Sequence, residues 1–362
     1  MTDRRIRNLA KTLVRYCVAV RRGDMVGVSG GILAAPLFSA VYEELLAAGA
    51  FPVLSMSPDG LGEILYRRGQ PHHFTTLTPY ARAHARCMDA TINIYSQSNS
   101  RALSGADPRK QVQLSKTMKP VSEILHRKPW VITLFPTEAY AQDAEMSLRA
   151  FEDFVYGATF SDEDNPPAAW RAVGRKQDKL IARLRGADRV RIVGLETDLT
   201  LSVKGRTFVN SAGHRNMPSG EIFAAPVETS AEGRVRFDYP VCAYGREISG
   251  VRLVFRKGVV VEAAADKHAD FLNTMLDSDP GARRLGELGI GTNMKIQRFV
   301  KNILFDEKIG GTVHLALGRS PLDTRGKNQS AIHWDMIKDL RRGGAVYVDG
   351  RPFEKDGKFV GR

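Results

Sequence analysis

Two histidines and three carboxylates occur in surroundings that suit metal binding. His314 lies in Gly-Thr-Val-His-Leu-Ala-Leu-Gly, and His333 and Asp335 lie in Ser-Ala-Ile-His-Trp-Asp. Glu221 follows Pro-Ser-Gly, and Glu287 lies among glycines in Gly-Glu-Leu-Gly-Ile-Gly. Imidazoles and carboxylates are ligands that zinc and similar divalent ions accept. Because these residues exceed the tetrahedral set of one zinc, they indicate two ions that share a carboxylate. Such a pair activates water and polarises a carbonyl, which predicts a metal-dependent hydrolase.

Local sequence patterns indicate how the side chains are presented. If the chain is extended at His333 and Asp335, both side chains point to one face and Trp334 points to the other. A helix is expected directly afterwards, over residues 336–340. His314 lies between apolar residues in a pattern typical of a half-buried strand. The glycines beside the two glutamates allow close backbone approach or a positive φ.

Each of these residues also has a simpler interpretation. A histidine with apolar neighbours, such as His314, is often a hydrogen-bonded core residue. Glu221 could occupy the first turn of a helix, and either glutamate could be solvated. The sequence alone does not bring the five residues to one place, so these alternatives stay open.

The order of predicted elements divides the chain into two domains. Residues 1–187 predict an α/β domain with a mostly parallel sheet, because short apolar strands alternate with helices. The expected strands are 25–28, 52–56, 90–94 and 130–134, and the expected helices are 5–20, 36–48, 138–158 and 167–185. Residues 188–362 predict an α+β domain with largely antiparallel strands that carries the metal site. Turn signals there include Lys204-Gly205, Lys257-Gly258, Asp349-Gly350 and Asp356-Gly357.

Composition excludes several classes of protein. The chain has 362 residues, of which 43% are hydrophobic and 26% charged, as expected for a globular protein. We find no apolar run long enough for a membrane span and no signal peptide pattern, so no membrane partner is expected. The net charge of +13 is dispersed along the chain, which argues against a nucleic-acid partner. Three scattered cysteines without C-x-x-C spacing favour a cytoplasmic location.

Five longer segments carry a resemblance to a known family. These are Asn-Met-Pro-Ser-Gly-Glu-Ile-Phe around Glu221, Pro-Val-Glu-Thr-Ser-Ala-Glu-Gly from Pro226, Gly-Glu-Leu-Gly-Ile-Gly-Thr-Asn around Glu287, the run 303–318 around His314, and Ser-Ala-Ile-His-Trp-Asp to Asp335. Together they resemble the aminopeptidase T-like (thermophilic aminopeptidase) metallopeptidases, peptidase family M29. The resemblance covers residues 194–340, and the N-terminal half agrees mainly in its order of helices and strands.

The resemblance implies a cytoplasmic, homodimeric metallo-aminopeptidase that releases N-terminal amino acids from small peptides. It implies two divalent metal ions per chain, with zinc favoured and cobalt, manganese or magnesium as alternatives. By position in the motifs, the metal ligands are Glu221, Glu287, His314, His333 and Asp335. We expect Glu287 to be the bridging and catalytic carboxylate. Asp306 and Glu307 are candidates to accept the second ring N–H of a ligating histidine.

One departure from the family keeps other functions open. Members commonly carry a tyrosine a few residues after the first histidine, whereas this chain reads Leu317-Gly-Arg-Ser-Pro321-Leu322. Loss of a transition-state hydrogen bond could slow peptide hydrolysis or change the reaction. The scaffold also resembles an iron(II) ring-cleaving dioxygenase of the dihydroxypyridine type. His314, His333 and Asp335 could form its facial triad. A catalytically impaired binding protein is the remaining alternative.

Overall fold

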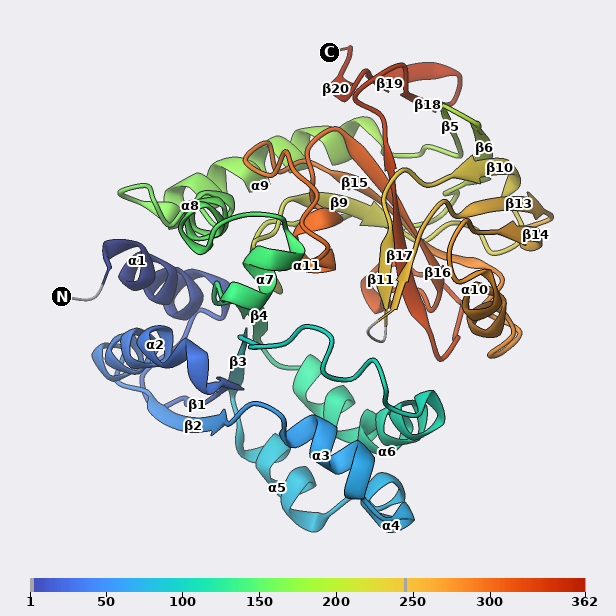
Figure 1. Cartoon of the computed structure of the whole chain (residues 1–362). Helices are drawn as coiled ribbons and strands as arrows, with labels where there is room; N and C mark the ends of the chain where they lie inside the picture. The colour runs from blue at the N-terminus through green and yellow to red at the C-terminus, as the bar shows by residue number, and fades with distance from the viewer. Residues whose placement is uncertain (1–2, 244–245, 362) are drawn as a thin grey trace. The chain divides into compact units, whose positions relative to one another are not determined.

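The computed structural model describes residues 3–243 and 246–361, which form two compact units (Figure 1). The first unit contains the chain up to Trp170 and the segment Gly213–Ser219. The second contains Arg171–Ala212, Gly220–Ala243 and the chain from Glu247 onward. The division into domains 1–187 and 188–362 stays a prediction. Among the described residues, no helix is long and apolar enough to cross a membrane.

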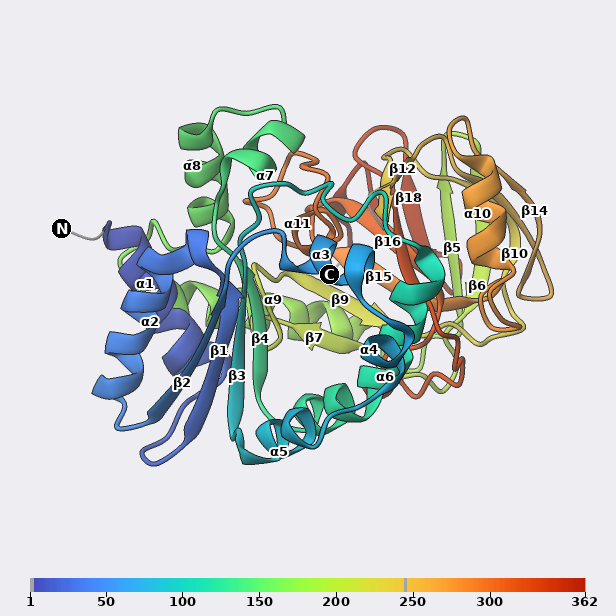
Figure 2. The ribbon, with the colours of Figure 1, turned by 60° about the horizontal axis from the view of Figure 1, so that its bottom comes forward.

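A parallel sheet forms the centre of the first unit, as predicted. Its order is β2-β1-β3-β4-β8, and every neighbouring pair is parallel. Figure 2 shows β2, β1, β3 and β4 side by side. Valine and isoleucine side chains such as Val26, Val28 and Ile92 are buried in this sheet, as expected for strands covered by helices. The strands are β1 (Met25–Gly31), β2 (Phe51–Ser57), β3 (Ala90–Tyr95), β4 (Trp130–Leu134) and β8 (Asn216–Met217).

The helices of the first unit begin and end at recognisable residues. Helix α2 (Ala35–Ala47) has Pro36 in its first turn and is followed by Gly49, which has a φ of +75°. The helix predicted over 138–158 is two helices, because Glu145 has a φ of 56° and Ser147 caps a new N-terminus. The remaining α-helices of this unit are α1 (Arg4–Thr12), α3 (Leu61–Arg68), α4 (Pro71–Thr75), α5 (Pro79–Cys87), α6 (Pro108–His126), α7 (Glu138–Asp143) and α8 (Leu148–Ala158). Helix α9 (Pro166–Arg183) begins in the first unit, and from Arg171 onward it belongs to the second.

The second unit contains an eight-stranded and a five-stranded antiparallel sheet, in agreement with the predicted fold class, and the short strands β11 and β12 pair with each other. The eight-stranded sheet has the order β14-β13-β10-β6-β5-β18-β19-β20. The turns at Lys257-Gly258, Asp349-Gly350 and Asp356-Gly357 join antiparallel neighbours, as predicted. The turn at Lys204-Gly205 instead connects strands of different sheets. The strands are β5 (Arg189–Gly194), β6 (Thr197–Ser202), β10 (Glu232–Arg236), β13 (Arg252–Arg256), β14 (Val259–Ala264), β18 (Ala345–Val348), β19 (Arg351–Lys355) and β20 (Lys358–Phe359).

The five-stranded antiparallel sheet carries all five predicted ligands. Its order is β17-β16-β15-β9-β7, with antiparallel pairing throughout. Its strands are β7 (Val209–Ser211), β9 (Glu221–Ala224), β15 (Leu285–Gly291), β16 (Thr312–Gly318) and β17 (His333–Asp339). The other elements in this part of the chain are α10 (Ala269–Leu276), α11 (Ile303–Asp306), β11 (Val241–Ala243) and β12 (Arg246–Ile248).

The helix predicted over 336–340 is wrong, because β17 continues to Asp339. Met336, Ile337 and Lys338 pair residue by residue with β16. Met336 packs into the hydrophobic core of this unit together with Leu315 and Leu288. Long-range pairing and burial therefore override the local helical pattern.

Candidate metal centre

Adjacent strands place the five predicted ligands on one face of the ligand-bearing sheet. Opposite Gly291 of β15 lies Glu221, and opposite Gly289 lies His314. Across β16 and β17, Ala316 pairs with Asp335 and Gly318 pairs with His333. Glu287 pairs with Ala316, so it shares the face of these residues. Because side chains alternate along a strand, the intervening residues point into the core instead. These core residues include Leu288, Ile290, Val313, Leu315, Leu317 and Met336.

Glycines create the room that the ligand side chains occupy. A Cβ atom on Gly289 would overlap the His314 imidazole on the neighbouring strand. The glycines of β15 therefore serve close approach, since they lie outside the positive-φ region. Gly220, next to Glu221, does require its conformation: its φ is +113°, and a Cβ there would lie 2.6 Å from the Asn293 Cβ.

Substituting Gly289 by alanine tests this close approach. The added methyl group forces the His314 ring out of its place, a strain of about 1–3 kcal/mol. We expect Gly289→Ala to weaken metal binding by about 10–100-fold, measured by competition with a chromophoric chelator. Gly157→Ala is the matched control, because a Cβ at Gly157 in α8 meets nothing within 4 Å. Unchanged affinity in Gly289→Ala would show that His314 is not held by this contact.

The five side chains lie around Glu287, as the distances between their nitrogen and oxygen atoms show. The Nε2 atom of His314 lies 3.3 Å from Glu221 Oε2 and 3.3 Å from Glu287 Oε1. The Nε2 atom of His333 lies 3.5 Å from Glu287 Oε2 and 3.4 Å from Asp335 Oδ2. The two oxygens of Glu287 thus face different histidines. We call Glu221, Glu287 and His314 the first position, and Glu287, His333 and Asp335 the second position. In each, ligand atoms lie within 4.8 Å of one another.

Burial leaves some of these polar atoms without a protein partner. Glu221 is 4% exposed, Glu287 is 6% exposed and His314 is fully buried. Among the described residues, Glu221 Oε2 and Asp335 Oδ1 are buried without a hydrogen-bond partner. Unpaired buried carboxylate oxygens are costly, and a bound cation removes that cost. The donor set therefore fits divalent metal ions.

Mutual electrostatics shift the pKa values of the ligands in the metal-free protein. Burial lowers the pKa of His314, but the hydrogen bond to Glu287 and the charge of Glu221 outweigh it and raise that pKa to about 10. Burial raises the pKa of Glu221 to about 7, although Lys308 opposes this. Burial also raises the pKa of Asp335 to about 6, against the influence of His333. The metal-free centre therefore holds a proton on His314 at neutral pH.

Metal binding should consequently depend on pH. A metal ion binds the neutral imidazole, so binding at the first position displaces the proton of His314. Below the raised pKa of His314, we expect the affinity for cobalt(II) to increase about tenfold per pH unit for each proton displaced. Chelator competition from about pH 6 to about pH 8, corrected for the chelator's own protonation, measures this. An affinity that does not change over this range would contradict the protonated state of His314.

The second ring nitrogens of the two histidines have different surroundings. Nδ1 of His333 donates to the Arg319 carbonyl oxygen at 2.7 Å, which orients Nε2 toward the second position. Nδ1 of His314 is buried without a partner among the described residues. Asp306 is not its acceptor, because the Asp306 carboxylate binds the backbone N–H groups of Val300 and Asn302.

The sequence nominates Glu307 only as a hydrogen-bond acceptor for a histidine, and it gives no indication of Lys308. Glu307 lies within 4.8 Å of ligand atoms of His314 and Asp335, so it forms a further candidate metal-binding group. Lys308 is fully buried and lies next to the carboxylates of Glu307 and Glu221. Burial lowers the pKa of Lys308, but the two glutamates raise it more strongly, so the net shift is upward. A lysine directly before Ile-Gly-Gly gives no sequence signal of such burial.

Comparison with known proteins defines the class. The thermophilic metalloprotease (M29) family matches residues 2–359, and the chain belongs to this family. Aminopeptidase 2 of Geobacillus stearothermophilus is 27% identical to this chain, in an alignment that spans 98% of this chain and 95% of the relative. Aminopeptidase T of Thermus thermophilus is 28% identical over 73% of this chain and 75% of its own. The structure of wild-type AmpT from Thermus thermophilus has the same fold, with a TM-score of 0.86 over 99% of both chains at 24% identity.

These matches confirm the predicted family and the predicted class of enzyme. They support a metal-dependent aminopeptidase and do not favour the ring-cleaving dioxygenase. The geometry agrees, because His314 and His333 belong to different ligand groups among the described residues. A single iron held by both histidines and Asp335 has no counterpart in these groups.

Proposed function

We propose that this chain is an aminopeptidase that releases N-terminal amino acids from small peptides with two divalent metal ions sharing Glu287. One observation carries the proposal: the two oxygens of Glu287 face two different histidines, at 3.3 and 3.5 Å. Glu221 adds an oxygen at the first position and Asp335 adds one at the second. The five predicted ligands thus fall into two sets with a shared carboxylate.

The residues of the chain prepare this centre for hydrolysis. When bound, a pair of divalent ions supplies a water of lowered pKa and a Lewis acid for the peptide carbonyl. Burial raises the pKa of Glu287, but the hydrogen bond from His314 and the charge of His333 have a larger, opposite effect. The net shift of the pKa is downward, so Glu287 is ionised. An ionised Glu287 would serve both as the shared ligand of two ions and as an acceptor for a proton at its carboxylate. The Arg319 carbonyl keeps His333 in the tautomer with a free Nε2.

Zinc is the proposed metal, with cobalt, manganese and magnesium as alternatives. Two imidazoles among three carboxylates suit borderline ions, whereas magnesium favours oxygen ligands alone. We also propose a cytoplasmic location, which agrees with three free cysteines.

A homodimer is proposed as the working form. Edge strand β2 and helix α2 expose large apolar side chains, which is typical of a surface that another chain covers. They are Tyr42, Leu46, Phe51, Leu54 and Met56. Sedimentation equilibrium tests this, with the dimer mass expected and the monomer mass at micromolar concentration as the contradicting result.

Metal-reconstituted assays against a panel of amino-acid arylamides test the proposed function. We expect the chelated protein to be inactive and to recover when zinc, cobalt or manganese is added. A protein that stays inactive toward every arylamide but consumes oxygen with iron(II) and a dihydroxylated ring would contradict the proposal.

A further inference from the structure

A buried lysine contacts two carboxylates at the edge of the first position. The side chain of Lys308 is 0% exposed, and its Nζ atom lies 3.5 Å from Glu221 Oε1. The same atom donates to Glu307 Oε1. Glu221 comes from β9, whereas Glu307 follows α11. The ammonium group of Lys308 therefore contacts two carboxylates from different parts of the chain beside the metal centre.

The backbone around Lys308 is fixed, so its ammonium group has a defined place. The Lys308 N–H donates to the Phe305 carbonyl at 3.0 Å, and its carbonyl accepts from the Asn293 N–H at 3.1 Å. Gly291 of β15 lets this backbone approach closely, because a Cβ there would overlap the Ile309 carbonyl. Lys308 is thus anchored to the segment that directly follows the strand carrying Glu287.

The two oxygens of Glu221 have different surroundings as a result. Oε1 faces Lys308, whereas Oε2 lies 3.3 Å from His314 Nε2. Among the described residues, Oε2 has no hydrogen-bond partner. One oxygen of Glu221 therefore faces a fixed ammonium group, and the other faces the His314 nitrogen that would bind the same metal ion.

We propose that Lys308 is a positioning residue that restricts Glu221 to binding the first metal ion through Oε2 alone. The inference rests on the proposed function and deepens it. A carboxylate can bind a cation with one oxygen or with both. Catalytic metal sites keep a coordination position open for water or substrate. By holding Oε1, Lys308 keeps Glu221 from filling that position.

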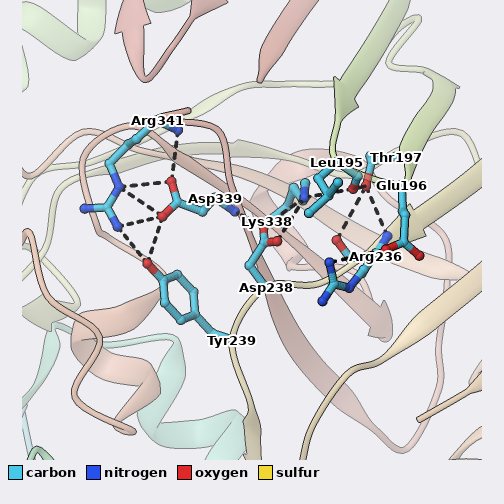
Figure 3. Close-up of polar contacts among 9 residues, drawn as sticks. All are labelled: Leu195, Glu196, Thr197, Arg236, Asp238, Tyr239, Lys338, Asp339 and Arg341. Carbon is cyan, nitrogen blue, oxygen red and sulfur yellow. Dashed lines mark hydrogen bonds and ion pairs between the residues drawn. The ribbon is translucent and has the colours of Figure 1, made fainter. Parts of the chain in front are cut away.

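A second buried lysine offers a matched control. Lys338 of β17 has a side chain that is 1% exposed, and its Nζ lies 2.9 Å from Asp238 Oδ2. It also donates to the Leu195 carbonyl at 3.2 Å. Figure 3 shows this group with Tyr239, Asp339 and Arg341, and it contains none of the predicted ligands. Lys338→Met therefore reports the cost of removing a buried lysine without touching the proposed ligands.

The test compares Lys308→Met, Lys308→Gln and Lys338→Met in the full-length protein. Measurements are metal equivalents per chain, the visible absorption spectrum of the cobalt(II)-loaded protein, and kcat and KM with an aminoacyl arylamide. In Lys308→Met, both oxygens of Glu221 become free to bind. We expect two retained equivalents, weaker cobalt absorption from a higher coordination number, and a kcat lowered by about 10–100-fold. Lys308→Gln, which keeps a donor, should recover part of the wild-type spectrum, and Lys338→Met should keep all of it.

Two outcomes would overturn the inference while leaving the proposed function intact. One is a wild-type cobalt spectrum and turnover in Lys308→Met. The other is complete loss of one ion, which would make Lys308 necessary for binding itself. If Lys308→Met does not fold, the same measurements on Lys308→Gln decide. Glutamine is a weaker, neutral donor, so a wild-type cobalt spectrum and a wild-type kcat in this variant would contradict the positioning role of Lys308. A wild-type protein that binds no metal would instead refute the proposed function.

Discussion

Glu287→Gln should lower the turnover of an aminoacyl arylamide by about 10³-fold while leaving the fold intact. Glutamine has the shape of glutamate, so the packing of β15 is retained. It lacks the negative charge and one of the two oxygens that face His314 and His333. The substitution therefore removes the proposed shared ligand and the proposed proton acceptor together. Steady-state kinetics measure the loss, and circular dichroism checks the fold.

A buried glutamate elsewhere in the same unit provides the control for this substitution. Glu354 of β19 is 0% exposed, and burial raises its pKa to about 8. Because the raised pKa favours the neutral, protonated carboxyl group, glutamine resembles Glu354 in the folded protein, and Glu354→Gln should keep full turnover. Turnover near the wild-type level in Glu287→Gln would remove Glu287 from the catalytic role.

His333→Ala should remove one of two ions and leave the other. His333 belongs to the second position, whereas the first is built from Glu221, Glu287 and His314. We expect about one equivalent of metal per chain and a kcat/KM lowered by at least about 10²-fold. If the chain instead held one iron ion at a mononuclear site, His333→Ala would remove a ligand of that single ion.

His268→Ala is the matched control for His333→Ala. Each histidine has Nδ1 hydrogen-bonded to a backbone carbonyl, at 2.8 Å to Glu247 for His268 and 2.7 Å to Arg319 for His333. His268 is exposed and belongs to none of the ligand groups found among the described residues. The His268→Ala variant should therefore keep both ions. Two retained ions in His333→Ala would contradict the second position.

The fold class was predictable because its signals are local. The apolar neighbours of His314 predict strand β16, although this strand is buried on both faces and not half-buried as expected. The spacing of His333 and Asp335 predicts one shared face. The helix predicted after Asp335 was wrong, since the pairing of β17 with β16 depends on residues far apart in the sequence. Periodicity over a few residues does not contain that information.

The sequence nominates residues for the candidate site, but it does not give their arrangement. The motifs nominate Glu221 and Glu287, yet only the strand register puts both on one face. Gly289 was predicted to matter through its backbone, and the structure gives the reason as room for the His314 ring. Lys308 escaped prediction, because an isolated lysine is normally solvated and its burial depends on tertiary contacts.

Titrating the metal-free protein with zinc or cobalt, while recording bound metal and turnover together, tests the central claim most directly. The shared carboxylate predicts that bound metal saturates at two equivalents per chain and that full turnover appears only as the second ion binds. Saturation at one equivalent with full turnover, or turnover without any bound metal, would contradict the account.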